Sequence, residues 1–177
     1  MRSAFFPLLF STALTCFIAA TSFAGESCEA LIKKGDVHYA RLQPTEALKY
    51  YLPAEQLEPN NVSLLVRIAR QYRHLHSECS RKEDKAKWAG MAVEYAKRAV
   101  GLAPDDAEAQ LALAVSYGKL LPFQSTKDQL SCSKTIKAAA EKTIQLDPRG
   151  DLAYQVLGRY YFTYADVSGV KRTLGSD

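Results

Sequence analysis

Three copies of a short sequence motif divide this chain at nearly equal intervals. Each copy has a leucine two positions before a proline, and the prolines lie 45 and 44 residues apart; the copies are Leu57–Asn61, Leu102–Asp106 and Leu146–Gly150. Because proline has no N–H to donate, it ends the preceding helix, and the residues after it can cap the next one. Self-similarity at such a period is typical of repeat arrays. The sequence therefore predicts a stack of helical hairpins.

Between these copies, apolar residues recur at helical spacing, so each unit divides into two helices. In the second unit Leu65, Ile68, Ala69 and Tyr72 fall on one helix face. Pro44 fits the first turn of a helix, where its missing N–H is tolerated. The expected helices cover about residues 28–41, 44–57, 62–73, 85–102, 107–118 and 132–146, and a further helix begins at Asp151.

Composition places the chain among ordinary folded proteins and narrows its partners. Apolar residues make up 47% of the chain and charged residues 24%, which excludes a disordered or fibrous protein. The net charge of +4 comes from basic residues spread along the sequence, without the concentrated stripe that nucleic-acid binding needs. The sequence has no phosphate loop, nucleophile elbow or zincin-type histidine pair. We therefore expect no enzyme activity, no cofactor and no nucleic-acid partner.

The first 24 residues have the organisation of a secretory signal peptide. Arg2 gives a positive start, residues 5–20 form an uncharged apolar run, and Ser22 and Ala24 are the small residues of a cleavage site. We expect cleavage after Ala24 and an exported protein, either periplasmic or secreted. The alternative is an uncleaved membrane anchor formed by residues 5–20, although this run is short for a bilayer core.

Removal of the leader would leave three cysteines, Cys28, Cys79 and Cys132. An odd number in an exported protein means either one disulfide and one thiol, or three thiols. If a pair exists, Cys79 and Cys132 are the favoured partners, because each lies in or directly beside an inserted segment of the repeat. A disulfide requires the two Cα atoms to lie within about 7 Å, so the sequence leaves both states open.

The start of the fourth unit resembles the tetratricopeptide signature W-x2-L-G-x2-Y, with tyrosine in place of tryptophan. The resemblance covers nearly all of residues 28–165. It implies an all-α fold, a right-handed α-α superhelix of about three and a half hairpins, in a domain of residues 25–165. Small residues let paired helices touch, and aromatic residues fill the gaps between hairpins. The positions expected to pack in this way are Gly35, Ala47, Ala54, Pro59, Ala69, Tyr72, Ala92, Ala99, Pro104, Ala114, Tyr117, Pro148, Tyr154, Leu157, Gly158 and Tyr161.

Units two and three exceed the 34-residue tetratricopeptide unit by 11 and 10 residues. We place the additional residues between the paired helices, at 74–84 and 119–131, where they would project from one edge of the solenoid. With the segments 92–99 and 157–162, these insertions are similar to the regulator of microtubule dynamics family and its bacterial relatives. That resemblance implies microtubule association, which would be irrelevant in a bacterial periplasm.

The fourth unit opens with a helix, but the sequence after Gly169 offers no second helix before Asp177. A solenoid normally covers its terminal apolar face with a polar capping element. We interpret residues 166–177 as a truncated tail; the alternative is dimerisation through the open end.

The first helix of each hairpin lines a concave groove in folds of this kind. Arginine and aromatic side chains there predict binding of an extended peptide or helix that carries acidic groups, although a solvated face with scattered charges has the same composition. The lysine-and-asparagine clamp that some tetratricopeptide domains use for a partner's C-terminal carboxylate is absent. The expected groove residues, with Asp36 at one end, are Tyr39, Val66, Arg70, Arg73, Leu111, Val115, Gln155, Arg159 and Phe162.

A second hypothesis is a metal-dependent or enzymatic module built on the inserted segments. His74, His76 and Cys79 lie close in sequence, and a zinc site would need Cys132 as a further ligand. Histidines at the end of a helix more often face the negative end of its dipole. We therefore favour a non-enzymatic interaction scaffold, with membrane association only if the leader is uncleaved.

Overall fold

The computed structural model describes the backbone of residues 25–174 and the side chains of residues 25–162. The expected signal peptide or anchor, with its cleavage site, lies outside these residues, as do positions 175–177 of the expected tail. No helix among the described residues combines the length and the apolar content that crossing a bilayer requires. The helices are α1 (Cys28–Ala40), α2 (Pro44–Leu57), α3 (Val62–Glu78), α4 (Lys82–Leu102), α5 (Ala107–Leu120), α6 (Thr126–Leu146) and α7 (Asp151–Leu174), with a short 3-10 helix, η1 (Leu121–Phe123).

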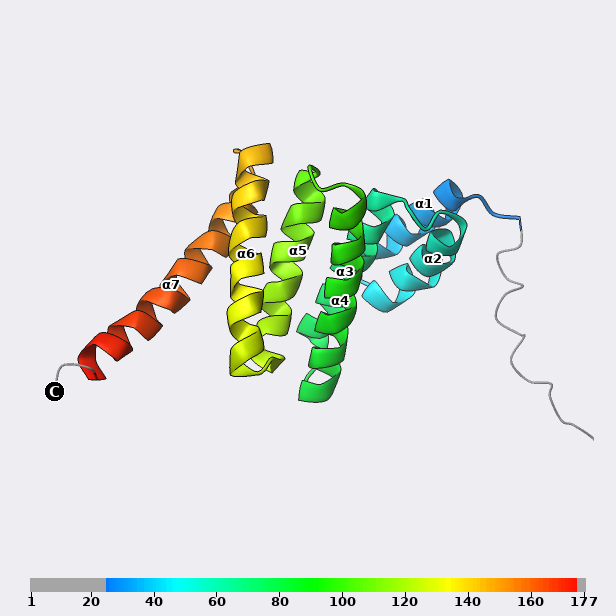
Figure 1. The fold of residues 1–177 in the computed structure, drawn as a ribbon. Helices are drawn as coiled ribbons and strands as arrows, with labels where there is room; N and C mark the ends of the chain where they lie inside the picture. Colours follow the sequence, from blue (N-terminus) through cyan, green and yellow to red (C-terminus); the bar gives the residue numbers. More distant parts are fainter. Residues whose placement is uncertain (1–24, 175–177) are drawn as a thin grey trace, which may run out of the picture.

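The helices stack in chain order into an open row of hairpins (Figure 1). Helices α1 and α2, α3 and α4, and α5 and α6 form antiparallel pairs, and the second helix of each pair packs on the first helix of the next. Helix α5 also contacts both α3 and α7, so the first helices share one side of the row. Helix α1 lies at one end and α7 at the other. The predicted all-α solenoid is confirmed.

At the three copies of the repeated motif, helices end where the sequence predicts. Helices end at Leu57, Leu102 and Leu146, and caps follow: Asn61 Oδ1 accepts from the Leu64 N–H at 3.1 Å, and Asp106 Oδ1 from that of Ala109 at 2.7 Å. A side-chain cap of this kind satisfies one of the backbone donors that the first turn leaves free.

The prolines of the repeated motif do not pack between helices, so the packing role expected of them is wrong. Pro59, Pro104 and Pro148 are all exposed, because each lies in the turn outside the helix ends. Their carbonyls instead accept hydrogen bonds, from Arg98 at 3.1 Å, Gln110 at 2.7 Å and Tyr154 at 3.1 Å, respectively. The prolines therefore end helices and anchor the turns, while other residues bring the helices together.

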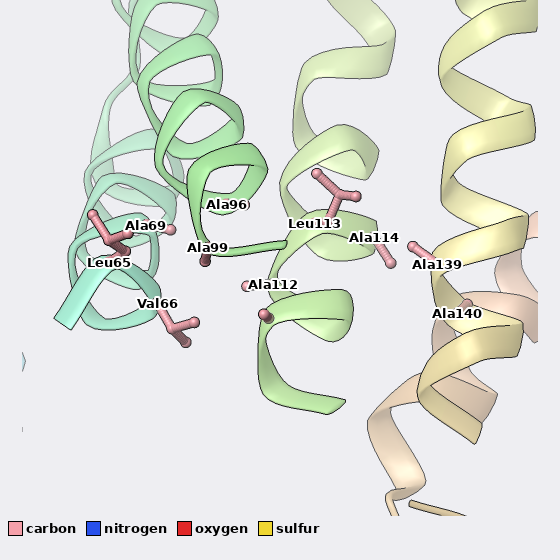
Figure 2. Close-up of a cluster of buried hydrophobic side chains, with 11 residues drawn as sticks. Leu65, Val66, Ala69, Ala96, Ala99, Ala112, Leu113, Ala114, Ala139 and Ala140 are labelled. Carbon is pink, nitrogen blue, oxygen red and sulfur yellow. The ribbon is translucent and has the colours of Figure 1, made fainter. Parts of the chain in front are cut away.

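Small residues bring the hairpins together, as predicted. Six of the expected packing residues have no exposed surface: Ala47, Ala54, Ala69, Ala92, Ala99 and Ala114. Figure 2 shows part of this core, in which Ala114 of α5 and Ala139 of α6 point toward each other. The buried residues form two clusters: Tyr72 belongs to one of them, and Tyr117 and Leu157 pack against the other. Methyl side chains at these contacts let neighbouring helices approach closely.

In the first hairpin, Gly35 of α1 lies directly against the ring of Tyr51 of α2. A Cβ at Gly35 would lie 2.5 Å from Tyr51 Cδ1, so only glycine fits. The ring is fully buried, and its hydroxyl donates to Asp36 Oδ1 at 2.6 Å. Burial, and then this hydrogen bond, raise the pKa of Tyr51. The predicted packing role of Gly35 is confirmed.

The two inserted segments do not form projecting loops, which corrects the sequence prediction. Helix α3 continues to Glu78 and α4 begins at Lys82, so most of residues 74–84 is helical. Likewise α5 continues to Leu120, and α6 begins at Thr126, where the Ser125 hydroxyl accepts from the Asp128 N–H at 3.3 Å. The first segment has no proline or glycine to stop a helix, so the additional residues lengthen the hairpins.

Helix α7 packs on α6, but within the described residues no following helix pairs with α7 to complete a hairpin. Tyr154 and Tyr161 are 48% and 50% exposed, and a Cβ at Gly158 would meet nothing within 4 Å. The packing expected of these three residues is therefore wrong, because the element they would contact is the following helix. The backbone of α7 continues to Leu174, through most of the expected tail.

Candidate functional site

A hollow of about 440 Å³ lies on the side of the row formed by the first helices. Its lining comes entirely from α1, α3, α5 and α7, as the groove prediction requires. Six of the nine predicted groove residues line this basic hollow, as we call it below: Tyr39, Val66, Arg70, Arg73, Leu111 and Val115.

A second hollow, of about 290 Å³, continues from the first toward the end of the row. It is lined by the predicted residues Gln155 and Arg159, and we call it the apolar hollow. Val115, Lys119 and Leu152 line both hollows, so the two adjoin, and we call them together the groove.

Phe162 lines neither hollow and is 74% exposed, so its assignment to the groove is wrong. In Figure 1 the later turns of α7 extend away from α6, beyond the body of the row. Phe162 lies about one turn past Arg159 on α7, and most of its side chain faces solvent.

Asp36 lies at the α1 end of the groove, as expected, but its carboxylate is engaged. Besides the Tyr51 hydroxyl, it accepts a hydrogen bond from Arg67 Nε at 3.1 Å. Asp36 and Arg67 line a smaller hollow of about 280 Å³, which shares Tyr39, Val66, Arg70 and Glu108 with the basic hollow. The network of Asp36, Tyr51 and Arg67 fixes α3 against the first hairpin at this end.

Arg70 and Arg73 face the basic hollow without a carboxylate partner among the described residues. Arg70 donates to the Tyr39 hydroxyl at 3.2 Å, and its Cζ lies 5.5 Å from the centre of that ring. Arg73 donates to the Ser116 hydroxyl at 3.3 Å. Loss of solvent, and then the neighbouring charge of Arg70, lower the pKa of Arg73 to about 10. The hollow thus holds two neighbouring cations that neutral side chains position.

Besides Ala112 and Leu152, four polar residues of the basic hollow lie outside the predicted groove set: His74, Ser77, Glu108 and Lys119. Lys119 Nζ donates to the Ser77 hydroxyl at 3.3 Å, and the His74 ring lies 6.2 Å from the Tyr39 ring. Burial, followed by the charge of Arg73, lowers the pKa of His74. Three of the four lie at 74–84 or 119–131, and only continuation of the helices brings them into the groove.

The alternative metal site is not assembled in the part of the chain that the structure describes. His74 lies in the groove, whereas His76 is buried with Nδ1 3.0 Å from the Lys85 carbonyl oxygen. No three histidine, cysteine, aspartate or glutamate side chains between residues 25 and 162 come together in a way that could hold a metal ion. Cys79 and Cys132 are both free thiols, so of the two states that the sequence leaves open, the structure has the one without this disulfide.

This open row of α-hairpins, with a groove lined by the first helix of each hairpin, defines a tetratricopeptide-like solenoid. Solved structures share the fold at low sequence identity. The first tetratricopeptide domain of human RPAP3 superposes with a TM-score of 0.63 at 18% identity, over 80% of this chain and 95% of that one. The Sgt2 tetratricopeptide domain from Aspergillus fumigatus gives a TM-score of 0.62 at 20% identity, over 80% of this chain and 81% of that one.

Sequence comparison defines the family. The model of the regulator of microtubule dynamics proteins 1-3 matches residues 31–176. Regulator of microtubule dynamics protein 1 of Pongo abelii is 27% identical over 88% of this chain and 49% of its own length; protein 2 of Mus musculus is 27% identical over 63% of this chain and 27% of its own. The chain belongs to the regulator of microtubule dynamics family and spans at most about half of these relatives.

Proposed function

We propose that this protein is a non-enzymatic scaffold that binds an acidic peptide, or an acidic face of a helix, along the groove of its first helices. The single observation that carries the proposal is the pair Arg70 and Arg73, which face a hollow with no carboxylate paired to either among the described residues. Tetratricopeptide-like folds are protein-interaction scaffolds, and the family assignment agrees with that general role.

The electrostatics of the basic hollow favour an anion over a neutral ligand. Arg70, Arg73 and Lys119 line it, and Glu108 is the only carboxylate among its lining residues. The lowered pKa of Arg73 means that its charge is poorly solvated in the free protein. A ligand carboxylate would supply the missing counter-charge, and a guanidinium can accept it through two parallel hydrogen bonds.

The groove also has a shape suited to a chain rather than to a small molecule. It runs past three first helices and onto α7, and the two hollows together exceed 700 Å³. A related fold gives a precedent: the first tetratricopeptide domain of Spaghetti (RPAP3), with a TM-score of 0.62 and 18% identity, is described as bound to the HSP90 peptide SRMEEVD. That peptide carries three acidic residues, which is the ligand chemistry proposed for this chain.

The identity of the partner depends on where the protein resides. The family name points to microtubules, whereas the leader over residues 1–24 points to export. Because the leader indicates export, we propose that the partner is an exported or periplasmic protein with an acidic exposed segment.

Charge reversal tests the groove directly. The variants Arg70→Glu and Arg159→Glu alter groove residues, while Arg149→Glu alters an exposed arginine in the α6–α7 turn and matches them in net charge. A fluorescent peptide with two adjacent glutamates serves as the probe in an anisotropy titration. We expect at least about tenfold weaker binding for the two groove variants, and little change for Arg149→Glu, with melting temperatures close to that of the wild type. Equal loss in all three variants would mean that net charge, and not the groove, attracts the peptide.

A further inference from the structure

The apolar hollow differs in chemistry from the basic hollow beside it. Most of its wall surface is apolar and comes from α5, η1, α6 and α7, with the aliphatic side chains Val115, Leu121, Ile136, Leu152 and Val156. The polar residues of the same wall are Lys119, Ser133, Gln155 and Arg159. At about 290 Å³ it lies just below the size of the pockets that enclose drug-sized molecules. A space of this size and lining suits one bulky apolar side chain.

The two hollows meet at a shared boundary, so one ligand would occupy both. Lys119, Val115 and Leu152 line each of them, and Lys119 therefore places a cation at the junction. An extended peptide advances about 3.3 Å per residue. A carboxylate held by the arginines and an apolar side chain in the second hollow would thus be separated by only a few residues of one peptide.

We infer that the groove recognises a two-part peptide motif, in which acidic residues bind the basic hollow and one bulky apolar residue, a leucine or phenylalanine, fills the apolar hollow. This inference rests on the proposed function and adds a determinant of specificity to it. The acidic part attracts the ligand over a distance, and burial of the apolar side chain distinguishes one acidic segment from another.

Gly118 of α5 provides a means to close the apolar hollow without disturbing the fold. It lines the hollow, and a Cβ at this position would meet nothing within 4 Å. A leucine placed there has room to occupy the space otherwise available to the ligand, and it favours the helix more than glycine does. Gly101, in the last turn of α4, is the matched control, since its Cβ also meets nothing within 4 Å and it lines neither hollow.

The test measures the binding of a set of octapeptides to the full chain by fluorescence anisotropy. Every peptide carries two adjacent glutamates on a glycine-serine background, and a single phenylalanine is placed one to four positions before or after them. A peptide with alanine in place of phenylalanine is the reference. In at least one register we expect phenylalanine to bind about tenfold more tightly than alanine, because its ring leaves water.

The variants then locate that gain. In Gly118→Leu we expect the phenylalanine peptide to bind only as well as the alanine peptide binds to the same variant. In Gly101→Leu the tenfold gain should persist. If the glutamate peptides bind but phenylalanine adds nothing in any register, or if the gain survives in Gly118→Leu, the two-part motif is wrong while the proposed function stands. If no glutamate peptide binds the wild type, both are wrong.

Discussion

Replacement of Gly35 by alanine should destabilise the protein even though alanine is the better helix former. Gly35 lies within α1, where this exchange would by itself stabilise the helix by about 1 kcal/mol. The added Cβ, however, would lie 2.5 Å from Cδ1 and 2.9 Å from Cζ of Tyr51. Both distances are far below a normal carbon–carbon contact of about 3.5 Å.

The magnitude follows from how firmly Tyr51 is held. The ring has no exposed surface, and its hydroxyl is bonded to Asp36 at 2.6 Å, so the ring cannot move aside without breaking that bond. Overpacking costs up to about 3 kcal/mol, and the hydrogen bond contributes about 1 kcal/mol more. After subtraction of the gain in helix propensity, we expect Gly35→Ala to lower the free energy of unfolding by about 2 to 3 kcal/mol.

Urea denaturation followed by circular dichroism at 222 nm measures this change. Gly90→Ala is the control, because Gly90 lies inside α4 and a Cβ there meets nothing within 4 Å. It should stabilise the protein by about 0.5 to 1 kcal/mol. Truncation of the ring removes the clash, so a double-mutant cycle of Gly35→Ala, Tyr51→Leu and the double variant should give a coupling energy above about 1 kcal/mol. If both alanine variants shift stability in the same direction, the steric argument is refuted.

Three further predictions concern the groove and the thiols. Arg73→Gln should weaken binding of the glutamate peptide about tenfold in an anisotropy titration. The free energy of unfolding should stay unchanged or rise slightly, because the poorly solvated charge is removed while a donor to Ser116 remains. A large loss of stability would contradict this prediction. Binding of that peptide should strengthen as pH falls from 7 to 5.5. The lowered pKa of His74 leaves its ring neutral at pH 7, and a bound carboxylate favours protonation of the ring. His74→Gln should abolish this pH dependence, and its persistence in the variant would exclude His74 as the source. In the chain that begins after Ala24, a thiol reagent should modify partly exposed Cys79 first, and buried Cys28 and Cys132 only on unfolding, since burial raises the pKa of both buried thiols. Complete unfolding of that chain should expose three reactive thiols, and a total of one would indicate a disulfide.

The sequence predicts this fold well where a local stop signal exists. Each helix boundary beside Pro59, Pro104 or Pro148 lies where the sequence predicts it, because proline and the following cap act within a few residues. The inner ends of the hairpins were missed. Residues 74–84 are polar and carry no stop signal, so the sequence does not distinguish a loop from additional turns of helix.

The groove was predicted in part for a similar reason. Residues on the inner face of α3 and α5, such as Arg70 and Leu111, follow from helical periodicity alone. Lys119 and His74 belong to the groove only because their helices continue. The exposure of Tyr154 and Tyr161 depends on whether another helix covers α7, and a match to a repeat signature carries no information about that neighbour.

The location of the bound peptide tests the central claim most directly. In an amide nitrogen–proton NMR titration with the glutamate peptide, we expect the largest shifts in α3 and α5, around Arg70, Arg73 and Val115, extending to Tyr39 of α1 and Gln155 of α7. Helices α2 and α4, which lie outside the lining of the two hollows, should change little. Shifts concentrated in α2 and α4, with the inner faces of α3 and α5 unchanged, would contradict it.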